Sequence, residues 1–278
     1  MTIYTKINLF LREIVLVNVM AWADLTTIDA QINGLFSCII FGFGIVLFLH
    51  LFARYWKTRR PDTILTAVAF LTLGSAWLGG VGTFVSVILT GQPLEPKSQV
   101  LIYSWAPPLT TTLWTYLGFR LVKPRLQYYA LGVLAVMAAI HLFGAYVLVP
   151  RAIPQKTPEG ETDLGGLILY YSAGNMSYTS YRGYLFVVTT ILVLSASMFV
   201  GLMFLRLSRT TDRPETRARG LFIGVGAILF GSSVIIDEIF IPKGFFNVLS
   251  HLDIVLSMVL LYCGYILPPW LKRRINLD

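Results

Sequence analysis

Seven apolar stretches fill most of this chain, and each has the roughly 20 residues that an α-helix needs to cross a bilayer. Their continuous apolar character argues against lipid-facing barrel strands, in which polar and apolar residues alternate over about ten positions. The sequence therefore predicts an all-α fold, a bundle of seven transmembrane helices. The predicted spans are 34–55, 62–90, 99–122, 127–149, 183–207, 219–241 and 247–271.

Composition agrees with a membrane location. Hydrophobic residues make up 56% of the chain and charged residues 13%, and the mean hydropathy is +0.71, well above the balance of a soluble domain. We expect a multi-pass protein of the cell membrane with three regions: an N-terminal interfacial segment at 1–33, a membrane domain at 34–271 with a long outer loop at 150–182, and a basic cytoplasmic tail at 272–278.

Positive charge predicts the orientation. Fifteen of the 22 lysine and arginine residues lie in alternate gaps between the spans and in the tail. Such residues are retained on the cytoplasmic side, which predicts an N-terminus outside and a C-terminus in the cytoplasm. A nucleic-acid partner is not expected, because no soluble module carries a basic stripe. The fifteen are Arg54, Lys57, Arg59, Arg60, Arg120, Lys123, Arg125, Arg206, Arg209, Arg213, Arg217, Arg219, Lys272, Arg273 and Arg274.

The first residues permit two interpretations. The apolar run at 14–20 is too short to span a bilayer. It predicts an amphipathic helix lying in the outer interface, with Trp22 as its anchor. The alternative is a signal peptide, since Ala21 and Ala23 offer small residues for cleavage.

Ionisable residues inside predicted spans are the candidate site, because a charge in a membrane usually pairs, changes protonation state or faces a wet cavity. Four interpretations stay open: water-exposed helix ends, a ligand- or proton-sensing pocket, a divalent metal site without a recognisable ligand motif, and a haem between two of the histidines. The sequence does not decide among these four interpretations, so the identity of any cofactor is left open. The candidates lie in the predicted outer half and are His141, Asp237, Glu238, His251 and Asp253.

A proline pair interrupts the third span. Pro107 and Pro108 remove two backbone donors and bend a helix, and in a membrane the freed carbonyls must find other partners. We therefore expect a hinge at this point.

The order of these features resembles the N-terminal seven-helix sensor region of membrane histidine kinases. The similarity rests on the basic turn from Arg54 to Pro61, on Trp105-Ala106-Pro107-Pro108 with the aromatics and basic exit that follow, and on the basic gap from Arg206 to Arg219. Only seven residues follow Leu271 in this sequence, so we expect no kinase domain beside this region. The resemblance implies ligand sensing or membrane anchoring, and we expect no enzymatic activity. Output would pass through a separate protein partner at the cytoplasmic face or within the membrane.

Three functions remain possible from the sequence. The first is a receptor or sensor that detects an external ligand, ion or pH through an outward-facing polar pocket. The second is a structural or accessory subunit of a membrane complex, and the third is a small carrier. A retinal protein is excluded, because the seventh span at 247–271 has no lysine for the Schiff base.

Overall fold

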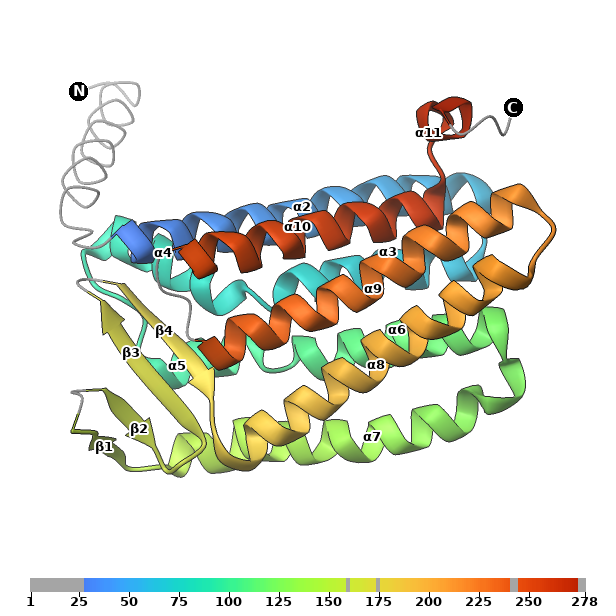
Figure 1. Ribbon diagram of the computed structural model, residues 1–278. Coiled ribbons are helices and arrows are strands. Elements are labelled where there is room, and N and C mark those ends of the chain that lie inside the picture. Colours follow the sequence, from blue (N-terminus) through green and yellow to red (C-terminus); the bar gives the residue numbers. More distant parts are fainter. Residues whose placement is uncertain (1–27, 159–160, 174–175, 241–244, 275–278) are drawn as a thin grey trace, which may run out of the picture.

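Long helices run back and forth between the two ends of an elongated bundle (Figure 1). This computed structural model describes residues 28–158, 161–173, 176–240 and 245–274. The helices are α2 (Ile28–Thr58), α3 (Pro61–Ser75), α4 (Leu78–Thr90), α5 (Pro96–Tyr103), α6 (Ala106–Val122), α7 (Gln127–Phe143), α8 (Gly183–Thr210), α9 (Pro214–Phe240), α10 (Phe245–Ile266) and α11 (Pro269–Arg274). Short helical turns η1 (Pro124–Leu126), η2 (Gly144–Leu148) and η3 (Val149–Arg151) flank α7.

Within the described residues, five helical segments are long and apolar enough to cross a membrane: those of α2, α7 with its flanking turns, α8, α9 and α10. A sixth results if α3 and α4, which meet at 53°, count as one bent crossing. The predicted third span is divided between α5 and the 17-residue α6. The bundle is thus helical and of membrane type, and the predicted interfacial helix at the N-terminus falls in residues 1–27, outside the described part.

Prolines set several helix starts. Pro61, Pro96, Pro214 and Pro269 are the first residues of α3, α5, α9 and α11, where a missing N–H costs nothing and the fixed φ suits the helix. The missing N–H of proline also divides the predicted third span, because Pro107 and Pro108 are the second and third residues of α6.

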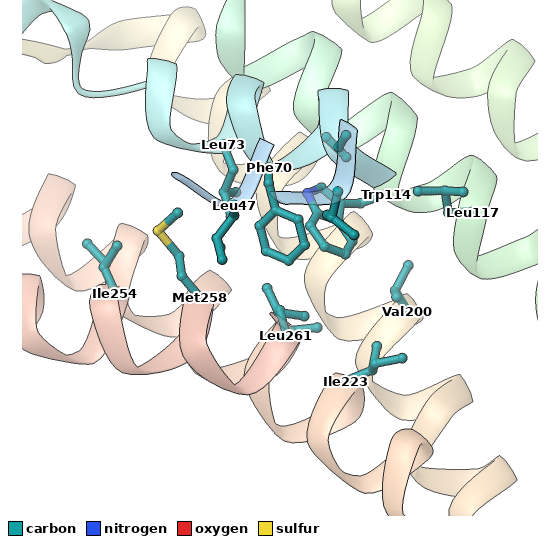
Figure 2. Packing of buried hydrophobic residues seen from close by; sticks show 14 of the residues in the cluster. Leu47, Phe70, Leu73, Trp114, Leu117, Val200, Ile223, Ile254, Met258 and Leu261 are labelled. Atoms are coloured by element: carbon teal, nitrogen blue, oxygen red, sulfur yellow. The ribbon is translucent and has the colours of Figure 1, made fainter. Parts of the chain in front are cut away.

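The core lies at the centre of the bundle, where α2, α3, α6, α8, α9 and α10 meet (Figure 2). Phe70 of α3 packs edge-on against Trp114 of α6, with ring centroids 5.2 Å apart, and Trp114 lies 5.1 Å from Tyr265 of α10. In contrast, only Leu134 and His141 are buried in α7. That helix is peripheral, and its exposed apolar side chains suit contact with lipid.

Helices α8 and α9 approach closely through small residues. A Cβ atom at Gly224 would lie 2.6 Å from Cγ of Leu205 and 2.9 Å from the carbonyl oxygen of Gly201. Gly220 likewise faces Phe204 and Ser208 of α8, and Gly231 faces Ser197 of the same helix. The glycine stripe of α9 therefore serves packing within the chain, as small residues do between membrane helices.

A four-stranded antiparallel sheet occupies the long loop between α7 and α8, where the sequence analysis expects none. Its strands are β1 (Pro154–Lys156), β2 (Thr162–Leu164), β3 (Ile168–Ala173) and β4 (Met176–Tyr181), paired in chain order. The longest ladder joins β3 to β4 from Ile168–Tyr181 to Ala173–Met176. The sheet lies across one end of the bundle, and β4 contacts α2, α4 and α5 (Figure 1).

Basic residues gather at the opposite end, which carries the α2–α3, α6–α7 and α8–α9 connections and α11 (Figure 1). Among the described residues, two ionic contacts join different elements there. Arg120 Nη1 of α6 lies 3.2 Å from Asp62 Oδ1 of α3, and Glu215 Oε1 of α9 contacts both Arg219 Nη2, at 2.9 Å, and Lys272 Nζ of α11, at 3.3 Å.

Candidate functional site

The five candidate residues of the sequence analysis lie on three helices. Asp237 and Glu238 belong to the last turn of α9, and their side chains are outside the described part of the structure. Asp253 of α10 is half-buried. His251, also of α10, is fully buried, with its ring 5.4 Å from Phe36 of α2.

His141 stands apart from that group, on the peripheral helix α7 (Figure 1). Its Nε2 lies 3.0 Å from the carbonyl oxygen of Ser104, and its Nδ1 lies 2.9 Å from Oγ1 of Thr189. Because a carbonyl only accepts, Nε2 carries the proton, and the hydroxyl of Thr189 can then donate to Nδ1. Both ring nitrogens are thus used within the protein, which makes His141 a bracing residue rather than an open ligand for a metal or haem.

The α5–α6 break shows why a brace is needed there. In a continuous helix the carbonyl of Ser104 would accept from the N–H of residue 108, but Pro108 has none. His141 supplies the missing donor. Two neighbouring carbonyls are satisfied in the same manner, since Tyr146 Oη donates to Leu101 and Trp105 Nε1 to Ile102 at 2.8 and 2.7 Å. The helix is therefore interrupted directly before the proline pair, and side chains bond three carbonyls at this break. A hinge at this point stays a prediction.

A cavity of about 170 Å³ lies between this break and the sheet. Strand β4 covers it with Thr179, Ser180 and Tyr181, while α2, α3, α4, α5, α6, α8 and α9 supply the remaining wall. None of the five candidates of the sequence analysis is among its described lining residues. The lining residues that carry hydroxyl or amide groups are Asn33, Ser37, Gln99, Tyr103, Thr110, Thr111, Thr179, Ser180, Tyr181, Thr189 and Thr190.

Hydrogen bonds hold the polar wall in place. Tyr181 Oη lies 3.0 Å from Oγ of Ser104, and Tyr103 Oη lies 3.2 Å from Oγ1 of Thr179. The ring of Tyr181 also packs edge-on against His141, with centroids 5.3 Å apart. The sheet, the α5–α6 break and α7 are thus joined beside the cavity.

Apolar residues complete the wall of the cavity. Leu73, Trp77, Val193 and Phe230 line the cavity, and the rings of Trp77 and Phe230 meet edge-on at 6.3 Å. Apolar and aromatic walls with a few converging polar groups are typical of small-molecule sites.

A smaller cavity of about 30 Å³ lies deeper in the bundle. It shares five lining residues with the larger one, namely Leu73, Thr110, Thr111, Val193 and Phe230. Its remaining wall reaches Trp114 and Leu261, which belong to the central core (Figure 2).

The described walls of both cavities contain no charged acid or base. Their described lining residues include no acid, base or histidine, and no group of three or more His, Cys, Asp or Glu side chains that could hold a metal occurs among the described residues. Sequence reasoning missed the hydroxyl residues because Ser and Thr are common in apolar helices. One local signal was present, the run Thr110-Thr111-Thr112 directly after the proline pair.

No protein-family model matches the chain, and no curated protein is significantly similar to it.

Proposed function

We propose that the chain crosses the membrane seven times, with α3–α4 and α5–α6 each forming one broken crossing. The sheet then lies outside and the basic end lies in the cytoplasm. Two observations support this proposal, the first for the repeated crossing and the second for the orientation. The helices alternate in direction along the bundle (Figure 1), and the connections at the end opposite the sheet carry the basic residues that favour a cytoplasmic position.

The function that the geometry supports best is a membrane receptor or sensor for a small external molecule. The observation that carries this proposal is the cavity of about 170 Å³ beneath β4. A cavity of about 150 Å³ accommodates a molecule the size of benzene, so this one suits a ligand of similar or slightly larger size. The hydroxyl groups and aromatic rings of the wall would orient such a ligand.

The acidic candidates keep a place in this proposal. Ile235 lines the cavity, and Asp237 and Glu238 follow it within less than one turn of α9. They would act at the rim rather than at the centre of the site. His141 would act indirectly, by holding Thr189 and the α5–α6 break in the positions that shape the wall.

Output would pass to a separate protein at the basic end. The resemblance to histidine kinase sensor regions implies such a partner, and this end presents exposed arginines and lysines on several elements, among them Arg54, Lys57 and Arg209. An acidic surface on a partner, or anionic lipid headgroups, would complement this charge.

A cavity-filling variant tests the receptor proposal. Ala76 lines the cavity, so Ala76→Phe should displace a bound molecule. Ala135→Phe on the exposed face of α7 is the matched control. We expect native mass spectrometry of protein extracted in native lipid discs to show a bound small molecule in the wild type and in Ala135→Phe and its loss in Ala76→Phe. Equal occupancy in all three proteins would refute the proposal.

A small carrier is the second candidate, because the two cavities share lining residues and extend past Pro107 toward the centre of the bundle. A carrier would release its substrate at the basic end as well. Counterflow of a bound molecule into liposomes distinguishes it from a receptor, which would show binding without uptake.

A further inference from the structure

We propose that the smaller cavity is a water site in the middle of the membrane, supplied from the larger cavity and closed toward the basic end by the aromatic rings of Phe70, Trp114 and Tyr265. This inference does not depend on which molecule the larger cavity binds, or on whether the protein is a receptor or a carrier.

The first support is a set of buried polar atoms along one face of α6. Thr110 Oγ1 and Trp114 Nε1 are buried and make no hydrogen bond to any described residue, and their residues are 5% and 7% exposed. They stand four positions apart, which places them on one face of the helix. Both residues line the smaller cavity. Buried polar groups in proteins almost always have a partner, and ordered water is the common one where no protein group is near.

The second support is the size of the site. A water molecule needs roughly 10–15 Å³ when cavity volume is measured by the positions open to a water-sized probe. The smaller cavity, at about 30 Å³, therefore has room for roughly two waters on that scale. Ser197 lines the same cavity, but its hydroxyl already donates to the carbonyl of Val193 at 2.6 Å. The threonine hydroxyl and the indole N–H are thus the groups that water would bind.

Access and closure come from the neighbours. Thr110 and Thr111 line both cavities, so water that entered the larger cavity would lie next to the smaller one. On the other side, Phe70, Trp114 and Tyr265 form a layer of edge-on rings with centroids 5.2, 5.1 and 6.5 Å apart. Below that layer the carbonyl of Tyr265 accepts from Arg219 Nη1 at 2.8 Å. The aromatic layer thus separates the proposed water from the ionic contacts at the basic end.

Radiolytic labelling tests this site directly, because X-rays generate hydroxyl radicals from bound water inside a protein. In the full chain in lipid nanodiscs, Trp114 should be oxidised although it is buried. Met258 is an internal control, since it is fully buried, is easily oxidised, and lines neither cavity. We expect Trp114 to be modified and Met258 to stay unmodified. Protection of both residues would overturn the proposal, and so would modification of both, which would indicate opening of the whole bundle.

Filling the cavity gives the second measurement. Ala227 and Ala196 line the smaller cavity from α9 and α8. Ala227→Leu should abolish the oxidation of Trp114 and leave that of Trp77, which lines only the larger cavity, unchanged. Ala196→Leu serves the same purpose if Ala227→Leu does not fold, and Ala135→Leu on the exposed face of α7 is the control. Undiminished oxidation of Trp114 in a folded variant would overturn the proposal.

Discussion

Nε2 of His141 donates to the carbonyl of Ser104 across 3.0 Å, in place of the backbone N–H that Pro108 lacks. A proline on one helix is thereby compensated by a histidine on another. The pair also connects the cavity wall to the periphery, because Thr189 lines the cavity and bonds the second ring nitrogen.

Replacement of this histidine should destabilise the bundle. His141→Leu leaves the carbonyl of Ser104 and the hydroxyl of Thr189 without their partner, and a buried polar group left unsatisfied costs about 1–3 kcal/mol. We expect a lower midpoint of thermal unfolding in detergent. His50→Leu is the control, because His50 is exposed on α2. Equal midpoints for the two variants would contradict this assignment.

Restoring the backbone donor should reduce the importance of the histidine. Pro108→Ala provides an N–H that can bond the carbonyl of Ser104 directly. The loss caused by His141→Leu should therefore be smaller in the Pro108→Ala background than in the wild type. A double-mutant cycle of unfolding free energies measures this coupling. Strict additivity would show that the histidine and the proline act independently.

The α8–α9 contact should not tolerate added volume. A methyl group at Gly224 would meet Leu205 and the backbone of Gly201, and overpacking of this kind typically costs about 1–3 kcal/mol. Gly224→Ala should thus lower stability in denaturant titrations. Gly132→Ala on α7 is the matched control, since a Cβ there meets nothing within 4 Å and alanine favours a helix over glycine.

The contacts of Glu215 should hold α11 rather than the bundle. Its partners Arg219 and Lys272 are about one-third exposed at their side chains, and exposed ion pairs contribute at most about 1 kcal/mol. Glu215→Gln should therefore leave the unfolding midpoint nearly unchanged while trypsin cleaves faster after Lys272. Glu161→Gln, on the sheet side of the molecule, should not alter that cleavage.

Membrane orientation can be measured with two single cysteines in a chain lacking Cys38 and Cys263. Lys156 is exposed on β1, and Arg213 is exposed between α8 and α9. A membrane-impermeant maleimide should label Lys156→Cys in intact cells and Arg213→Cys only after permeabilisation. Labelling of both in intact cells would place the two ends of the bundle in one compartment and reject the proposed topology.

Hydropathy located the helices well, because lipid requires long apolar segments and leaves little freedom in where they begin and end. It located α2, α8, α9 and α10 within several residues, and it marked the break at Pro107 and Pro108. It did not foresee the bend between α3 and α4, because no proline marks the turn at Ala76 and Trp77.

The sheet was missed for a different reason. Its strands are short, from three to six residues, so the alternation of polar and apolar residues that marks a strand is too brief to recognise. One local signal existed, because Gly174-Asn175 lies between β3 and β4, and a Gly-Asn pair between two such runs is typical of a hairpin.

The cavity could not be derived from one-dimensional patterns. Ionisable residues stand out in an apolar sequence, and they drew attention to the ends of α9 and α10. The observed wall instead combines hydroxyl residues from elements far apart in the chain, such as Ser37, Thr111 and Thr179. Their proximity follows only from the packing of the bundle. His141 connects the two descriptions, as a candidate from the sequence that bonds Thr189 of the wall.

The four strands of the sheet follow one another without a crossover, and both of their ends lead directly into helices at Arg151 and Gly183. The cover of the cavity therefore belongs to a single continuous segment of the chain. Replacement of that segment would change the cover of the cavity in one step and leave the order of the helices unaltered.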